Sequence, residues 1–118
     1  MTPLKICIPL RGASGYEYKF QAYSFHNFDE LNAGLQNTHY GGLYVFVRLV
    51  KDKFFPIYIG ETGDFSTRYQ HHHKEYCIMS YGANCIGLLP LNGNERQRKE
   101  MEKDLLEHYN LPCNEKNN

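Results

Sequence analysis

The pattern of hydrophobic and polar residues predicts two kinds of β-strand in this chain. In residues 16–25, apolar side chains take alternate positions up to Ala22, with charged and amide side chains between them. This alternation is typical of a strand with one buried face. Residues 43–50 are apolar on both faces, so this strand is expected inside a sheet and covered on both sides. Residues 1–16 contain two prolines and two glycines and predict an irregular arm or a short edge strand.

A hairpin and one further strand complete the predicted sheet. The polar residues 51–53 predict a turn, after which residues 54–60 return as the partner of the preceding strand. Pro56 has no amide hydrogen to donate, so its position must face a sheet edge or a bulge. Residues 84–91 predict the next strand of the sheet.

Three helices are predicted, each after a residue whose side chain can accept a hydrogen bond from the first helical turn. They cover residues 28–35, 65–72 and 95 to about 109, capped by Asn27, Asp64 and Asn94. Pro112 forbids extension of the last helix. The expected fold class is therefore α/β of the α+β type: a small antiparallel sheet flanked by helices, with residues 16–25 as an extra N-terminal strand.

Length and composition predict one globular domain. The 118 residues suffice for a single compact domain, and no repeat, low-complexity tract or linker divides them. The longest apolar run, residues 43–47, is too short to span a membrane. Pro3 and Pro9 interrupt the N-terminal stretch, which is too short for a secretory signal. We therefore expect a soluble, cytoplasmic protein that does not act on membranes.

The charge balance limits how this chain could contact nucleic acid. Thirteen Lys and Arg residues balance thirteen Asp and Glu residues, and the basic residues are scattered along the sequence. A protein that binds polyanions by bulk attraction needs clustered basic residues, so zero net charge argues against that class. Any contact with nucleic acid is expected to be local, through a few well-placed groups.

The four cysteines do not predict a metal centre. They form no Cys-x-x-Cys pair, and Cys77 and Cys85 do not have the spacing of a zinc knuckle. His71, His72 and His73 precede Cys77 closely, but three consecutive residues on a helix point in different directions and cannot jointly bind one ion. Without a sign of export, the thiols are expected to be reduced and partly buried.

Two features of the sequence offer candidate chemistry. Tyr44 and Tyr58 take like positions on the two hairpin strands, each as the polar-tipped member of an aliphatic run. They are either core aromatics with locally bonded hydroxyls or functional groups. Glu102 falls on the apolar side of its helix, with Leu105 and Leu106. A carboxylate there either lies at the rim and reaches water, or is held for metal or proton chemistry.

A series of short elements resembles the GIY-YIG endonuclease family. In chain order they are Gly42-Leu43-Tyr44, Tyr58-Ile59-Gly60, Arg68 with His72 four residues later, Glu102 before a pair of leucines, and Tyr109-x-x-Pro112-x-Asn114. The order and spacing of the whole set carry the resemblance, because each tripeptide alone occurs by chance. It covers residues 42–114 and leaves residues 1–41 as an N-terminal extension of the single domain, residues 1–118.

The resemblance implies a stand-alone endonuclease that hydrolyses DNA phosphodiester bonds with one divalent cation. Glu102 would be the single protein ligand of Mg²⁺ or Mn²⁺, and such a cation keeps most of its waters. Arg68 would hold the scissile phosphate with its planar guanidinium. Asn114 would tie the chain end to the active-site face and contact phosphate or position the surroundings of Glu102.

The resemblance also assigns the attacking water to Tyr44, Tyr58 and His72, with Tyr44 as general base. A phenol with a pKa of about 10 is a poor base at neutral pH, so Tyr44 needs a neighbouring cation or proton acceptor. Arg68 and His72 are the candidates. We expect these side chains and Glu102 to converge on one concave, mildly basic pocket.

Two other functions stay open at this point. The chain could be a catalytically weak or inactive nucleic-acid-binding or structural module with the same fold. It could also be a small metal-regulated toxin or accessory subunit that uses the cluster of His and Cys residues. Because this chain has no room for a separate DNA-binding region, specificity would come from substrate structure, from a homodimer, from a protein partner, or be absent.

Overall fold

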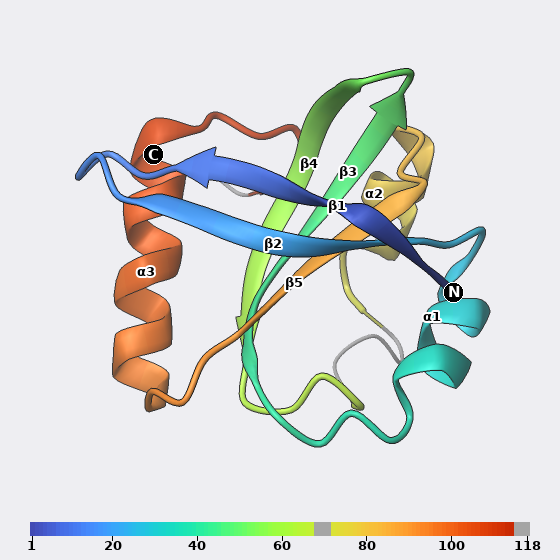
Figure 1. Cartoon of the computed structure of the whole chain (residues 1–118), viewed down its shortest axis with the longest axis horizontal. Helices are drawn as coiled ribbons and strands as arrows, with labels where there is room; N and C mark the ends of the chain where they lie inside the picture. Colours follow the sequence, from blue (N-terminus) through green and yellow to red (C-terminus); the bar gives the residue numbers. More distant parts are fainter. Residues whose placement is uncertain (68–71, 115–118) are drawn as a thin grey trace.

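The computed structural model of the chain describes residues 1–67 and 72–114. In chain order the elements are β1 (Thr2–Arg11), β2 (Glu17–Ser24), α1 (Phe28–Leu35), β3 (Gly42–Val50), β4 (Lys53–Thr62), α2 (Glu75–Ser80), β5 (Cys85–Pro90) and α3 (Glu95–His108). The strands form one five-stranded antiparallel sheet in the order β1-β2-β5-β3-β4 (Figure 1). The chain is thus an α+β fold, as the sequence predicts.

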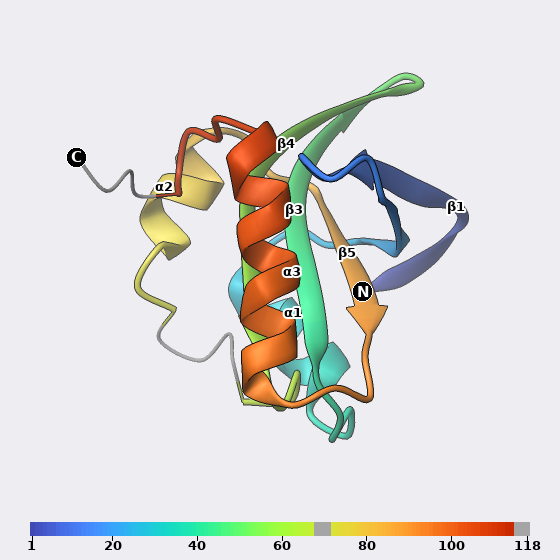
Figure 2. The ribbon, with the colours of Figure 1, turned by 90° about the vertical axis from the view of Figure 1, so that its left-hand side faces the viewer.

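The sheet carries a hydrophobic core on each face, and β3 contributes to both. Helices α1 and α2 lie on one side of the sheet and α3 on the other (Figures 1 and 2). Tyr44 and Phe46 belong to the core beneath α1 and α2, while Leu43 and Val45 belong to the core beneath α3. All four side chains are fully buried. The prediction that this strand is covered on both sides is therefore confirmed.

The β3–β4 hairpin has the irregularity that Pro56 predicts. Its register shifts between the pairs Phe46–Tyr58 and Val47–Pro56, and β4 is one of the two edge strands of the sheet. A residue without an amide hydrogen is tolerated at such an edge because no ladder bond is lost. Pro56 thus lies at both a bulge and an edge.

The N-terminal part of the chain contributes two strands, where one extra strand is expected from the sequence. Residues 1–16, predicted as an irregular arm or a short edge strand, contain the edge strand β1, which pairs antiparallel with β2 along most of its length. Ile8 and Leu10 alternate with exposed residues and bury themselves in the core on the α3 side. Pro3 and Pro9 fit because β1 is an edge strand, where a missing donor is tolerated.

Two of the three predicted helices are confirmed, together with their caps. The Asn27 side chain accepts a hydrogen bond from the Glu30 amide (2.8 Å) at the start of α1. Asn94 and Gln97 form a reciprocal capping box at the start of α3. In residues 1–67 and 72–114, no helix is long and apolar enough to cross a membrane.

The helix predicted over residues 65–72 is wrong in its described part. Residues 65–67 form a turn, His72 is not helical, and α2 begins only at Glu75. The Asp64 carboxylate accepts hydrogen bonds from both the amide (2.9 Å) and the hydroxyl (2.6 Å) of Ser66. Such local bonds favour a turn over a helix, and a cap signal in the sequence cannot distinguish the two.

Asp104 on α3 fixes the turn between β1 and β2. Its carboxylate accepts hydrogen bonds from the amide (2.8 Å) and hydroxyl (2.7 Å) of Ser14 and from the hydroxyl of Tyr18 (2.9 Å). The bonds from Ser14 lower the pKa of Asp104. Burial, followed by the bond to Asp104, raises the pKa of Tyr18 to about 12. One charged side chain thus connects the helix to the N-terminal strands.

We expect Asp104→Asn to reduce stability at neutral pH and to flatten its acid dependence. A carboxyl group with a lowered folded-state pKa stabilises the fold above its unfolded pKa of about 4, and this contribution disappears as pH falls through the folded value. Thermal unfolding between neutral pH and about pH 2 measures the effect, with Asp52→Asn in the exposed β3–β4 turn as control. A melting profile parallel to that of the wild type throughout would contradict the role of Asp104.

Candidate functional site

Three of the predicted site residues meet on the sheet face that α1 and α2 cover. The Tyr44 hydroxyl lies 3.0 Å from Nε2 of His72. The ring centroid of Tyr58 lies 5.3 Å from that of His72 and 6.1 Å from that of Tyr44. Tyr44 is fully buried, whereas Tyr58 and His72 each keep 7% of their surface exposed. We call these three side chains the tyrosine–histidine cluster.

The β3–β4 register brings the two tyrosines together. Tyr44 lies opposite Gly60, and Tyr58 lies opposite Phe46, so the tyrosines are diagonal neighbours on one face. A Cβ atom at Gly60 would overlap the ring and hydroxyl of Tyr44. Only glycine therefore lets the Tyr44 ring lie across β4 and reach His72.

The backbone sets the hydrogen-bonding state of His72. Nδ1 of His72 accepts the backbone N–H of Lys74 at 3.0 Å. Because a backbone N–H can only donate, Nδ1 carries no proton, and in a neutral imidazole the proton then lies on Nε2. His72 thus donates to the Tyr44 oxygen across the 3.0 Å contact. The imidazole is a donor toward Tyr44 in this arrangement and not its proton acceptor.

Asn114 forms hydrogen bonds with the backbone along the outer edge of β4. Its side-chain amide donates to the Ile59 carbonyl and accepts the Ile59 N–H, both at 2.9 Å. The neighbouring Cys113 amide donates to the Ile57 carbonyl at 3.1 Å. The last described residues therefore pair with the outer edge of β4 on either side of Tyr58. In this position the Asn114 amide holds the strand that carries Tyr58.

A disulfide bond joins Cys77 on α2 to Cys113 beside β4. This corrects the expectation of reduced thiols for that pair, whereas Cys7 and Cys85 are free. Burial raises the pKa of the Cys85 thiol to about 11, so it is an inert core residue. Cys77 and Cys113 lie 36 residues apart, and only the packing of α2 against the chain end brings them together, which their spacing does not reveal.

Glu102 lies on α3, beside β4 and outside the tyrosine–histidine cluster as described. One turn earlier, Arg98 donates to Glu61 of β4 at 3.0 Å, and both side chains are largely buried. Glu102 lies about 6 Å beyond Arg98 along the axis of α3. Because α3 and β4 run in opposite directions (Figures 1 and 2), this position is beside the part of β4 that carries Ile59. Leu105 of the same helix packs into the core on the face opposite Tyr44.

Glu102 lies among other charged side chains. The pKa of Lys99 is raised, chiefly by its hydrogen bond with Glu95 and further by the charges of Glu61 and Glu102. The half-buried Glu102 carboxylate therefore lies at a mixed, charged edge of the molecule. Arg68, the predicted phosphate ligand, lies outside the described residues.

The Glu102 carboxylate could bind one divalent cation weakly. Within residues 1–67 and 72–114, no group of three or more His, Cys, Asp or Glu side chains is arranged to hold a metal ion. A single carboxylate such as Glu102 supplies the oxygen ligand that Mg²⁺ prefers, and water fills the other positions. The residues present therefore fit a cation held by one side chain and do not fit a closed structural site.

A groove of about 650 Å³ borders the tyrosine–histidine cluster. It is lined by His72, His73, Glu75, Tyr76, Met79 and Ser80. These described lining residues include the Glu75 carboxylate and two histidines. The predicted basic residue, Arg68, lies outside the described residues, so the prediction of a mildly basic pocket stays a prediction. The predicted residue that it contains is His72, and the aromatic side chain of Tyr76 on α2 is a feature that sequence reasoning missed.

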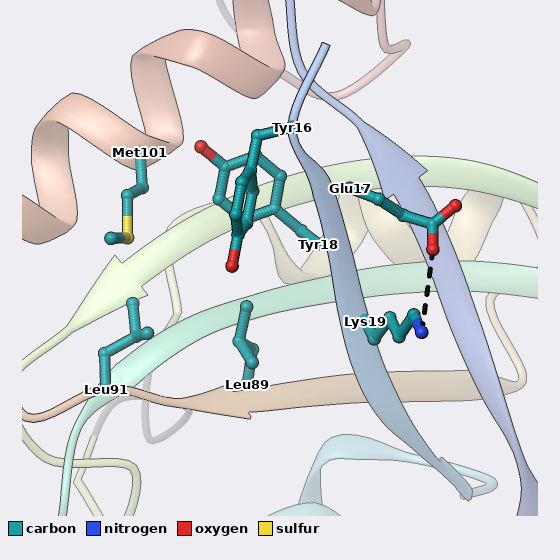
Figure 3. A pocket seen from close by; sticks show the side chains of 7 residues that line it. All are labelled: Tyr16, Glu17, Tyr18, Lys19, Leu89, Leu91 and Met101. Carbon is teal, nitrogen blue, oxygen red and sulfur yellow. Dashed lines mark ion pairs between the residues drawn. The ribbon is translucent and has the colours of Figure 1, made fainter. Parts of the chain in front are cut away.

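A second hollow, of about 520 Å³, lies on the other side of the molecule between β2, β5 and α3 (Figure 3). It is lined by Tyr16, Glu17, Tyr18, Lys19, Leu89, Leu91 and Met101. Lys19 pairs with Glu17 at 3.8 Å along its rim. None of the predicted site residues lines this hollow, so the groove beside His72 is the one relevant to the candidate chemistry.

Comparisons of the chain with protein-family models, curated proteins and solved structures found no match in any of the three. The residues and the geometry of the site therefore carry the functional proposal.

We expect Gly60→Ala to destabilise the fold through its contact with Tyr44. Overpacking a filled core costs about 1–3 kcal/mol of unfolding free energy, and here the added methyl group must displace the Tyr44 ring. In a Tyr44→Leu background the same change should cost much less. Urea unfolding of the four proteins in this cycle measures the coupling, and an equal cost of Gly60→Ala in both backgrounds would show that the ring contact is not the constraint.

Proposed function

We propose that this protein is a divalent-metal-dependent endonuclease that hydrolyses DNA phosphodiester bonds and belongs with the GIY-YIG nucleases that its motifs resemble. The observation that carries the proposal is the hydrogen bond between Tyr44 and His72, with Tyr58 beside it. These residues come from β3, from β4 and from the segment before α2. Their meeting supports a shared role in handling water and phosphate.

Tyr44 is the proposed proton acceptor for the attacking water. Hydrogen bonding to the charged form of a group favours that form, so the Nε2–H of His72 supports negative charge on the Tyr44 oxygen. His72 and Tyr58 form the outer layer of the cluster and Tyr44 the inner layer. In this proposal the water enters beside Tyr58, whose hydroxyl orients it toward the phosphorus, while His72 acts on Tyr44 because both of its ring nitrogens are already hydrogen-bonded.

Glu102 is the proposed ligand of Mg²⁺ or Mn²⁺. When bound, the cation would neutralise charge on the phosphate and leaving-group oxygens. Because β4 is an edge strand, a carboxylate beside it can face the scissile phosphate around the sheet edge, without the sheet between them. Asn114 and the disulfide of Cys113 hold that edge in place, which supports a site formed where the two faces meet.

Binding to DNA is proposed to depend on a few individual contacts. With equal numbers of basic and acidic residues, the chain gains little affinity from bulk attraction to phosphates. Arg68 is the proposed clamp on the scissile phosphate. Specificity then comes from substrate structure, from a second copy of the chain or from a protein partner.

A second candidate function is a catalytically weak or inactive module that binds nucleic acid with the same fold. The position of Glu102 favours it, because the helix that carries this carboxylate packs its apolar residues on the sheet face opposite Tyr44. In that case the tyrosine–histidine cluster is a packed aromatic core that retains a binding surface without turnover.

We expect the purified chain to nick supercoiled plasmid with Mg²⁺ or Mn²⁺, and Glu102→Gln to lower the rate about 100-fold or more, because a charge-stabilising group is lost. Glu107→Gln is the matched control, since Glu107 lies on the same helix in an exposed pair with Lys103. Nicking should cease in EDTA.

The outcomes separate the two functions. Equal metal-dependent rates for the wild type and Glu102→Gln would contradict the assigned role of Glu102. Plasmid binding without nicking, under all metal conditions, would support the binding module instead.

A further inference from the structure

Tyr76 stands out as an exposed aromatic ring beside the candidate site. It is 87% exposed, more than any other large hydrophobic side chain in the described part of the chain. It lies on α2 two residues before the buried Ile78, so it is not needed for the packing of that helix. Single exposed apolar residues are common on proteins. What distinguishes Tyr76 is that it lines the groove that also contains His72.

The groove offers surfaces for a flat, polar-edged ligand. Its volume of about 650 Å³ lies within the range of about 300–1,000 Å³ that is usual for ligand sites. The ring of Tyr76 and the thioether of Met79 provide stacking surfaces. Glu75 and Ser80 provide hydrogen-bonding groups of the kind that contact base edges.

The Glu75 carboxylate disfavours a phosphate beside it. Glu75 lines the groove, so a phosphate placed next to this side chain would face a like charge. His73 stacks on His72 with ring centroids 5.1 Å apart and continues the aromatic surface toward the cluster. A nucleotide that places its phosphate at the tyrosine–histidine cluster could therefore place its base in the groove.

The overall charge balance makes base stacking a useful source of affinity. Thirteen basic and thirteen acidic residues provide little of the phosphate attraction on which duplex binding depends. Stacking of a base on an aromatic ring contributes about 1–3 kcal/mol without any net charge. Only unpaired bases expose their faces, because in a duplex they stack on one another.

We propose that the substrate is DNA with unpaired bases, and that one base beside the scissile phosphate stacks on Tyr76 in the groove next to His72. This inference rests on the proposed nuclease function and specifies its substrate class. Tyr76 is then a specificity-determining residue, which holds the base while the cluster faces the phosphate.

The test measures binding of fluorescent oligonucleotides to the full chain in EDTA, where no cleavage is expected. The probes are a short oligothymidylate, an abasic strand of the same length and a blunt duplex of two fully complementary strands. Tyr76→Ala is compared with Tyr76→Phe, which keeps the ring, and with Tyr81→Ala. Tyr81 is the matched control, because it is 53% exposed at the end of α2 and does not line the groove.

Tyr76→Ala should weaken oligothymidylate binding about 5- to 150-fold, which corresponds to the loss of one stacked base. Tyr76→Phe and Tyr81→Ala should bind like the wild type. The abasic strand and the duplex should bind more weakly, and their affinities should not change in Tyr76→Ala. Thermal unfolding of Tyr76→Ala should match the wild type, because the ring is exposed.

Unchanged oligothymidylate binding by Tyr76→Ala would overturn the inference, as would a wild type that prefers the duplex. Metal-dependent plasmid nicking in the same preparation would then leave the proposed function standing. A chain that neither binds any probe in EDTA nor nicks plasmid with metal would overturn the proposed function, and the inference about Tyr76 with it.

Discussion

The contact between the Tyr44 ring and Gly60 is the constraint on which the site depends. Across the β3–β4 pair, a glycine leaves room for the ring to lie over the edge strand. That position brings the Tyr44 oxygen to Nε2 of His72, while the Lys74 amide holds Nδ1 and fixes the imidazole as the donor. One missing side chain on β4 therefore sets the position of the phenol, the partner that it meets and the direction of the hydrogen bond between them.

The two parts of the proposed site lie on opposite faces of the sheet, and both are next to the edge strand β4. On one face lie the tyrosines and His72, and on the other lies α3 with Glu102. Asn114 bonds both backbone groups of Ile59, and the disulfide of Cys113 ties this segment to α2. Residues 113 and 114 thus occupy backbone groups of β4 that could otherwise pair with a strand of another molecule. A phosphate at this edge could be approached from both faces, which a site in the middle of the sheet would not allow.

Much of the fold was predictable because its signals are local. The hairpin follows from two apolar runs around a polar turn, and α1 and α3 follow from their asparagine caps. The errors have two different causes. Asp64 bonds Ser66 in a local turn, which a cap signal in the sequence does not distinguish from a helix start. Cys77 and Cys113 lie far apart in the sequence, and only the folded structure shows that they meet. The motif order likewise predicts that Tyr44, Tyr58 and His72 meet, but it does not determine the sheet face on which the helix carrying Glu102 packs.

The central claim is that a cation held by Glu102 lies at the β4 edge, within reach of the tyrosine–histidine cluster. Titration of the isotopically labelled chain with Mn²⁺, followed by NMR, tests it most directly, because the paramagnetic ion broadens signals only near its site. The account predicts early broadening at Tyr58, Ile59, His72 and Asn114 that disappears in Glu102→Gln and persists in Glu107→Gln. Broadening that is centred elsewhere, or that survives in Glu102→Gln, would contradict it.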